Sequence, residues 1–305
     1  MDLTDRPPAP VRAPHRPRVL RELALSCHPG PVAAVTVLAA ALAVGSGPGN
    51  GRRVLVTAAV LTGQLSVGWC NDAHDAVRDA EAGRRGKPVA RGSTAPRTVW
   101  GAAFTALALC VVLSFACGAL AGAVHLTGVL AAWAYNLRLK ETVLSWLPYA
   151  IGFGGLPCLV ALSLPGGPWP AWWAVAAGAL LGVAAHLGDV LPDIAADLRA
   201  GVRGLPQRLG AARTRRLLPL PLAAATAVLV LGPPGAPGPA AVTALGGVAV
   251  CAVPACTRCA GPRPAGRRST GARRRRPWRK GALAGTVVVA AADVVLLLAR
   301  GTGVA

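Results

Sequence analysis

Acidic residues are scarce in this chain of 305 residues, with 12 Asp and Glu against 32 Lys and Arg. Charged residues of both signs make up only 14%, hydrophobic residues make up 53%, and the mean hydropathy is +0.50. This composition excludes an ordinary soluble domain and indicates a membrane protein. The N-terminus also lacks a cleavable signal pattern, because its first apolar run is followed by many more. We therefore expect the first apolar segment to be retained.

Long apolar segments recur along the chain, and a spanning helix needs about 20 mostly apolar residues. Turns rich in Gly and Pro separate these segments, as at 232–238. The pattern predicts an all-α, polytopic membrane protein. It has nine predicted transmembrane segments, at 28–46, 52–72, 96–117, 119–136, 142–163, 169–188, 214–232, 238–256 and 282–300.

The basic residues fall almost entirely on one side of this nine-span arrangement. The tail before the first segment and every second loop carry 29 of the 32 Lys and Arg, which leaves Arg52, Arg53 and Arg300 on the opposite side. Short cytoplasmic loops are enriched in Lys and Arg, so we expect a plasma-membrane protein with a cytoplasmic N-terminus and an external C-terminus. We interpret 1–20 as a disordered basic tail and 21–305 as one transmembrane domain with a basic cytoplasmic loop at 258–280.

Two other features have simpler interpretations. The net charge of +20 and the arginine-rich stretch 263–280 are typical of a loop that fixes topology and contacts anionic lipid, so we expect no nucleic-acid partner. Cys256 and Cys259 form a single CxxC motif with no second pair or nearby His, which disfavours a zinc site.

Half of the acidic residues lie in two clusters that end apolar segments on the same basic side. The clusters comprise Asp72, Asp75 and Asp79, preceded by Asn71, and Asp189, Asp193 and Asp197. On a helix, spacings of i, i+3, i+7 and i, i+4, i+8 place each set on one face. Carboxylates at a bilayer are costly unless cations or donors neutralise them.

The ligand types in these clusters favour a hard cation. Mg²⁺ is typically held by a few carboxylates together with substrate phosphate oxygens, whereas His74 and His186 offer only one imidazole beside each cluster for zinc. Arg138 and Lys140 directly follow the fourth apolar segment, where they could neutralise an anion. The residues therefore predict a diphosphate bridged by Mg²⁺ between two acidic helices.

The motifs resemble those of the UbiA superfamily of intramembrane prenyltransferases. Asn71-Asp-x-x-Asp-x-x-x-Asp79 is similar to the family's first signature, and Asp189-x-x-x-Asp-x-x-x-Asp197 is similar to its second. Tyr135-x-x-x-Leu-Lys140 resembles the tyrosine and lysine motif that follows the family's fourth helix. The resemblance covers roughly 20–300, although Ala80-Glu-Ala and Pro192 depart from the better-known branches, and Pro192 should kink or end its helix.

This resemblance implies a nine-helix bundle whose central cavity opens to the cytoplasmic side and into lipid. It implies transfer of an isoprenyl group from a prenyl diphosphate to a lipophilic or aromatic acceptor, with Mg²⁺ as cofactor and Arg138 and Lys140 as catalytic residues. The implied metal ligands are Asn71, Asp72, Asp75, Asp189 and Asp193. The implied diphosphate-binding residues are Asn71, Asp79, Tyr135, Asp197, Arg138 and Lys140.

Several alternatives stay open at this point. A cyclase of the same fold would act on the prenyl diphosphate without an acceptor, and a divalent-cation transporter would use the same intramembrane acids. A CDP-alcohol phosphotransferase needs D-G-x-x-A-R after its first Asp pair, whereas Asp75 is followed by Ala-Val-Arg-Asp. The sequence leaves the acceptor and the prenyl chain length undetermined.

Overall fold

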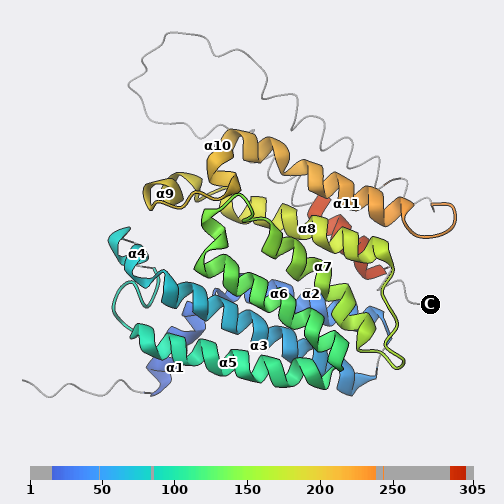
Figure 1. Ribbon diagram of the computed structural model, residues 1–305, viewed down its shortest axis with the longest axis horizontal. Coiled ribbons are helices and arrows are strands. Elements are labelled where there is room, and N and C mark those ends of the chain that lie inside the picture. The colour runs from blue at the N-terminus through green and yellow to red at the C-terminus, as the bar shows by residue number, and fades with distance from the viewer. Residues whose placement is uncertain (1–15, 48, 84–85, 238–242, 244–288, 300–305) are drawn as a thin grey trace, which may run out of the picture.

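The computed structural model describes residues 16–47, 49–83, 86–237, 243 and 289–299, and within these residues it contains helices and no strand (Figure 1). The predicted all-α class is therefore confirmed. The helices are α1 (Arg16–Ser26), α2 (Pro29–Gly45), α3 (Asn50–His74), α4 (Ala76–Glu81), α5 (Pro96–Ala116), α6 (Ala119–Leu137), the 3₁₀ turn η1 (Leu139–Glu141), α7 (Leu147–Leu162), α8 (Trp172–Val190), α9 (Ile194–Arg199), α10 (Leu205–Leu217), α11 (Pro219–Leu231) and a last helix at Val289–Ala299.

The number of membrane spans falls short of the predicted nine within the described residues. Four helices are long and apolar enough to cross a membrane, namely α3, α5, α6 and α8. Two bent pairs raise the number to six if each pair forms one span, because α1 meets α2 at 70° and α10 meets α11 at 47°. Helix α7 and the last helix are shorter, and the predicted segment 238–256 lies outside the described residues apart from Thr243.

Proline sets the start of several helices. It occupies one of the first two positions of α2, α5, α7, α10 and α11, where its missing N–H costs no intrahelical hydrogen bond. Helix α7 begins at Leu147 instead of the predicted residue 142, because η1 and a turn follow α6. Helix α1 begins at Arg16, so the predicted disordered tail 1–20 extends too far, while residues 1–15 lie outside the described residues.

Glycine allows the central helices to approach closely. In the bundle, α3 packs on α5, α6 on α7, α7 on α8 and α8 on α11, and Figure 1 shows α5 and α11 at opposite sides. A Cβ added at Gly182 would lie 2.2 Å from the carbonyl oxygen of Tyr149, and one added at Gly178 would lie 2.7 Å from that of Phe153. Small residues four positions apart on α8 thus bring the α7 and α8 backbones together.

Candidate active site

One cavity of ≈ 610 Å³ unites the two acidic clusters. Its walls come from α2, α3, α6, α7 and α8, and α4 and α9 lie at one end of the bundle (Figure 1). Asp72 and Arg138, which were also predicted as site residues, do not line it. The predicted site residues that line the cavity are Asn71, Asp75, Asp79, Tyr135, Lys140, Asp189, Asp193 and Asp197.

Both acidic clusters sit where a long helix breaks and a short helix follows. Helix α3 ends at His74, and α4 continues after Asp75, which lies between the two helices. Helix α8 ends at Val190, and α9 begins after a turn that contains Pro192, so the predicted effect of this proline is confirmed. The carboxylates are therefore divided between a helix end and a short helix, and they do not line one continuous helix as predicted.

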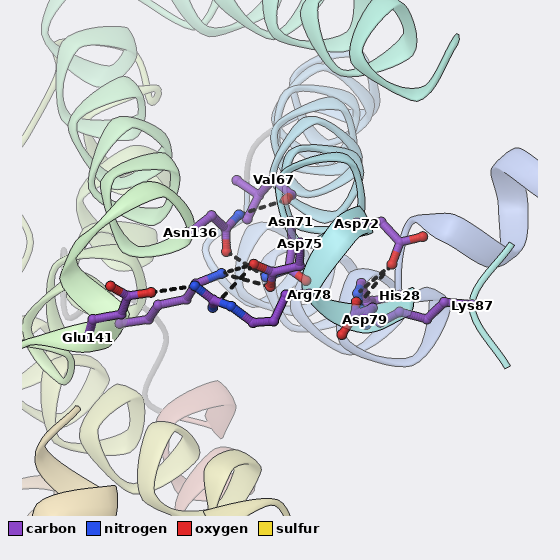
Figure 2. Close-up of polar contacts among 11 residues, drawn as sticks. His28, Val67, Asn71, Asp72, Asp75, Arg78, Asp79, Lys87, Asn136 and Glu141 are labelled. Carbon is purple, nitrogen blue, oxygen red and sulfur yellow. Dashed lines mark hydrogen bonds and ion pairs between the residues drawn. The ribbon is translucent and has the colours of Figure 1, made fainter. Parts of the chain in front are cut away.

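Asp75 lies at the centre of the first group of ionic contacts (Figure 2). The ammonium of Lys140 donates to both oxygens of Asp75, at 2.6 and 2.7 Å, and Arg78 approaches the same carboxylate at 3.5 Å. Arg78 also donates to Glu141 at 2.6 Å, and Glu141 follows Lys140 in η1. This group ties the end of α3 to the connection between α6 and α7.

A second group of contacts joins Asp72 and Asp79 through one lysine. The ammonium of Lys87 lies 3.0 Å from Asp72 Oδ1 and 2.7 Å from Asp79 Oδ2, and His28 Nε2 lies 3.8 Å from Asp72 Oδ1 (Figure 2). Asp72 is 2% exposed, and its Oδ2 has no hydrogen-bond partner within the described residues. Among the residues that the structure describes, Lys87 therefore provides the cation nearest to these two buried carboxylates.

The two lysines differ in the pKa that their surroundings produce. Burial lowers the pKa of Lys140, and the adjacent Asp75 only partly opposes this effect. Burial also acts to lower the pKa of Lys87, but Asp72 and Asp79 together outweigh burial, so the net effect raises it. Lys140 thus holds its proton less tightly than an ordinary lysine, and Lys87 holds it more tightly.

Two carboxylates of the second acidic cluster accept hydrogen bonds from neutral donors. The hydroxyl of Tyr149 donates to Asp189 Oδ2 at 2.9 Å, and the amide of Gln207 donates to Asp197 Oδ2 at 3.0 Å. The Tyr149 ring lies edge-on to Tyr135, with ring centroids 5.3 Å apart, and 4.9 Å from the ring of His186. His186 is 1% exposed and pairs with Ser145 at 3.1 Å, so it packs behind the cavity wall.

Several residues of this site were not predicted from the sequence. Asn136 receives a hydrogen bond from Asn71 at 3.0 Å and donates to the carbonyl of Val67 at 2.8 Å, which fixes the Asn71 amide at the cavity (Figure 2). Tyr149 and Gln207 hold the second cluster. The sequence offered one usable signal, since Asn136 is a polar residue at the end of an apolar segment directly after Tyr135.

The donor set fits a hard cation that binds together with an anionic ligand. Oxygen ligands from both clusters face one cavity, as Mg²⁺ with a phosphate ligand requires. Within the described residues, no group of three or more His, Cys, Asp or Glu side chains is close enough to hold a metal ion by itself. Substrate oxygens would therefore have to complete any metal site here.

Arg138 lies outside the cavity lining and, unlike Asp72, it is exposed. It follows α6, and its side chain is exposed. Lys140, only two residues later, is 6% exposed and lines the cavity. The predicted role of Arg138 with a diphosphate therefore stays a prediction that this geometry does not strengthen.

Several solved structures have a fold similar to that of this chain. A UbiA homolog from Archaeoglobus fulgidus bound to GPP and Mg²⁺ superposes with a TM-score of 0.61 at 17% identity, over 91% of this chain and 98% of that chain. An apo UbiA homolog from Aeropyrum pernix K1 gives 0.62 at 17% identity, over 87% and 95%. A digeranylgeranylglyceryl phosphate synthase gives 0.57 at 13% identity, over 93% and 98%.

Sequence comparison leads to the same family. The chain matches none of the curated proteins with which it was compared. The profile of the UbiA prenyltransferase family, however, matches residues 32–274, which is most of the sequence. With its apolar helices and this family match, the chain is an integral membrane protein. It belongs to the UbiA prenyltransferase family.

Proposed function

We propose that this protein transfers an isoprenyl group from a prenyl diphosphate to a lipophilic acceptor, such as an aromatic or quinone precursor. One observation carries the proposal: both acidic clusters and Lys140 face a single cavity whose remaining walls are largely apolar. A diphosphate needs the charged end of such a cavity, and an isoprenoid needs the apolar walls. The GPP and DMAPP bound by the Archaeoglobus fulgidus homolog support this substrate class.

Mg²⁺ is the cofactor that we propose, and Mg²⁺ is also bound in those homolog structures. When bound, it would supply charge stabilisation to the departing diphosphate. Asp72 lies beside Lys87, outside the cavity lining, so it would have to release Lys87 before it could bind the ion. The proposed ligands are Asn71, Asp72, Asp75, Asp189 and Asp193.

The residues of the chain itself have distinct proposed roles in the reaction. Lys140 would turn from Asp75 toward the diphosphate and donate hydrogen bonds to its oxygens as the C–O bond breaks. Tyr135, Asp79, Asp197 and Arg138 complete the proposed diphosphate-binding set. The apolar walls exclude water, which would otherwise capture the allylic cation before the acceptor does.

A direct assay tests this function. Purified protein in detergent with Mg²⁺ and geranyl diphosphate should release diphosphate and form prenylated products from added membrane lipid extract, and EDTA should stop both. Diphosphate release that is insensitive to EDTA would refute the metal-dependent reaction. A product formed from geranyl diphosphate alone, without any acceptor, would identify a cyclase instead.

The orientation in the membrane forms part of the proposal. The charge distribution of the sequence supports a plasma-membrane protein with a cytoplasmic N-terminus, an external C-terminus and a cavity that opens to the cytoplasm. A reporter fused after Ala305 should report the external side, and one inserted near Gly271 should report the cytoplasm. Two reporters on the same side would exclude the nine-span arrangement.

A further inference from the structure

The cavity has a second polar level, far from the acidic clusters. Its lining along α3 runs from Val60 to Asp75, a rise of about 22 Å at 1.5 Å per residue. Gln64 lies seven residues before Asn71, or about 10 Å deeper along the helix. Val67 and Gly68 separate the two polar levels, so the lining of α3 alternates between polar, apolar and polar sections.

Helix α6 places His125 at the same depth as Gln64. A Cβ added at Gly63 would lie 3.5 Å from His125 Cε1, so the backbone of the residue preceding Gln64 lies next to this imidazole. His125 lines the cavity and is 9% exposed, and its Nδ1 pairs with the fully buried hydroxyl of Ser114 at 2.8 Å. The Ser114 contact therefore fixes the ring and leaves Nε2 as its second polar atom.

Gln64 and His125 each offer a polar group to a ligand in the cavity. Within the described part of the chain, neither the Gln64 amide nor His125 Nε2 has a hydrogen-bond partner. Neither group is completely buried by the protein, and both residues line the cavity. An isoprenoid tail carries no polar atom with which to satisfy them, so burying these groups against a hydrocarbon would be costly. Gln64 offers a donor and an acceptor, which a hydroxyl group can satisfy in both directions.

We infer that Gln64 and His125 form a recognition site for an uncharged hydroxyl group of the acceptor. The group should be neutral, because the described residues lining this level include no charged side chain, and an unpaired charge there would be strongly disfavoured. The inference rests on the proposed function, since it identifies the second substrate of the same cavity as a hydroxylated lipophilic molecule. It excludes a plain hydrocarbon as the occupant of this level.

The test compares two probes that differ by one hydroxyl group, 4-ethylphenol and ethylbenzene. Binding is measured as the rise in Tm of the full chain in detergent, at equal probe concentration in the micelles. The buried free thiols of Cys27, Cys70, Cys110 and Cys117 allow a thiol-reactive fluorophore to follow unfolding. We expect an apparent Kd roughly 3- to 10-fold lower for the phenol, as one net hydrogen bond predicts.

Variants assign this preference to the site. Gln64→Leu should remove the preference for the phenol, and His125→Leu should do the same. Because His125→Leu also removes the hydrogen bond between His125 and the buried Ser114, Gln64→Leu keeps the test decisive if the histidine variant fails to fold. The control is Thr127→Val on α6, since Thr127 is exposed, donates to the carbonyl of Ala123 and does not line the cavity, so this variant should keep the preference.

Three results would overturn the inference. Equal Tm shifts with both probes would show that no hydroxyl is recognised, and an unchanged preference in Gln64→Leu would place the recognition elsewhere. A Gln64→Leu variant that alters which prenyl diphosphate length is processed, with no phenol preference in the parent protein, would assign this level to the tail. Diphosphate release from geranyl diphosphate is measured separately, so failure of the proposed function is distinguished from failure of this inference.

Discussion

The two acidic clusters of the cavity are neutralised in different ways. In the first cluster, lysines contact the carboxylates directly: Lys140 lies at Asp75, and Lys87 lies between Asp72 and Asp79. In the second cluster, the neutral hydroxyl of Tyr149 donates to Asp189, and the neutral amide of Gln207 donates to Asp197. The first cluster thus has cations of the protein beside it, whereas Asp189 in the second has a hydroxyl.

This difference suggests separate tasks for the two clusters. A carboxylate with a neutral partner keeps its negative charge available and attracts an incoming cation. A carboxylate paired with lysine must give up that partner before it can bind a metal ion, and the released lysine can then bind the anionic substrate. We therefore expect the second cluster to dominate metal affinity and the first to couple metal binding to diphosphate binding.

The largest effect should come from Asp189→Ala. It removes a proposed metal ligand without leaving a buried lysine unpaired, so we expect kcat/KM for geranyl diphosphate to fall roughly 10³-fold and the Mg²⁺ requirement to rise. Asp72→Ala, Asp75→Ala and Asp193→Ala should also lose orders of magnitude. The control Glu81→Ala alters an exposed acid on α4 and should remain near wild type. A larger increase in the Mg²⁺ requirement for Asp72→Ala than for Asp189→Ala would show that the first cluster, and not the second, dominates metal affinity.

The next effect concerns the lysine that should move to the substrate. Lys140→Ala should reduce kcat/KM by roughly 30- to 1,000-fold, or about 2 to 4 kcal/mol, as for loss of one preorganised donor. Arg138→Ala provides the matched comparison, because Arg138 is exposed outside the cavity lining, and it should lose much less. Steady-state kinetics would check both variants. Wild-type kinetics in the Lys140→Ala/Arg138→Ala double variant would show that neither residue contributes to the reaction.

A smaller effect should follow from changing the packing behind the second cluster. Gly182→Ala would place a Cβ 2.2 Å from the Tyr149 carbonyl, so α7 must shift and the contact between Tyr149 and Asp189 should weaken. We expect stability to drop by about 1 to 3 kcal/mol, as for overpacking, together with weaker metal binding. Mn²⁺ titration followed by electron paramagnetic resonance would measure the latter.

The control for this experiment is Gly101→Ala on α5. A Cβ at Gly101 meets no atom within 4 Å, so this variant should behave as wild type. Unchanged Mn²⁺ affinity in Gly182→Ala would show that Tyr149 does not orient Asp189.

The smallest effect is a pH dependence of the metal-free protein. Because the pKa of Lys87 is raised in the folded state, its ion pairs stabilise the protein fully below the ordinary lysine pKa of about 10.4, and this stabilisation is lost as the pH rises through the folded-state pKa. Tm should therefore fall above about pH 10.5 in EDTA. Lys87→Met should have a lower Tm at pH 8 and a weaker alkaline decrease. An identical alkaline decrease in Tm in the wild type and in Lys87→Met would show that groups other than Lys87 cause it.

The sequence predicted the main features of the fold because apolar length and motif spacing are local properties. Eight of the nine predicted segments correspond to described helices, namely α2, α3, α5, α6, α7, α8, α11 and the last helix at Val289–Ala299. The end of α8 near Pro192 also followed from the sequence. The errors concern short polar helical turns, such as η1 and the first turn of α1 at Arg16, because such turns give no apolar signal in the sequence.

The site was predicted in its residue types but not in its pairings. Asp75, Asp189 and Lys140 do face one cavity, as the motifs indicated. The spacing could not reveal that Lys87 bridges Asp72 and Asp79, because that contact depends on how the loop after α4 folds back. Nor could it reveal Tyr149, whose place beside Asp189 results from the close α7 and α8 backbones at Gly182.

The contact between Tyr135 and Tyr149 has a practical consequence for spectroscopy. The chain contains only two tyrosines, and both line the cavity with their rings 5.3 Å apart. Protein grown with isotopically labelled tyrosine would therefore give ring resonances from the cavity alone, without assignment of the other residues. Such spectra would report the arrival of metal, diphosphate or acceptor as separate changes in two signals, in micelles or in lipid bilayers.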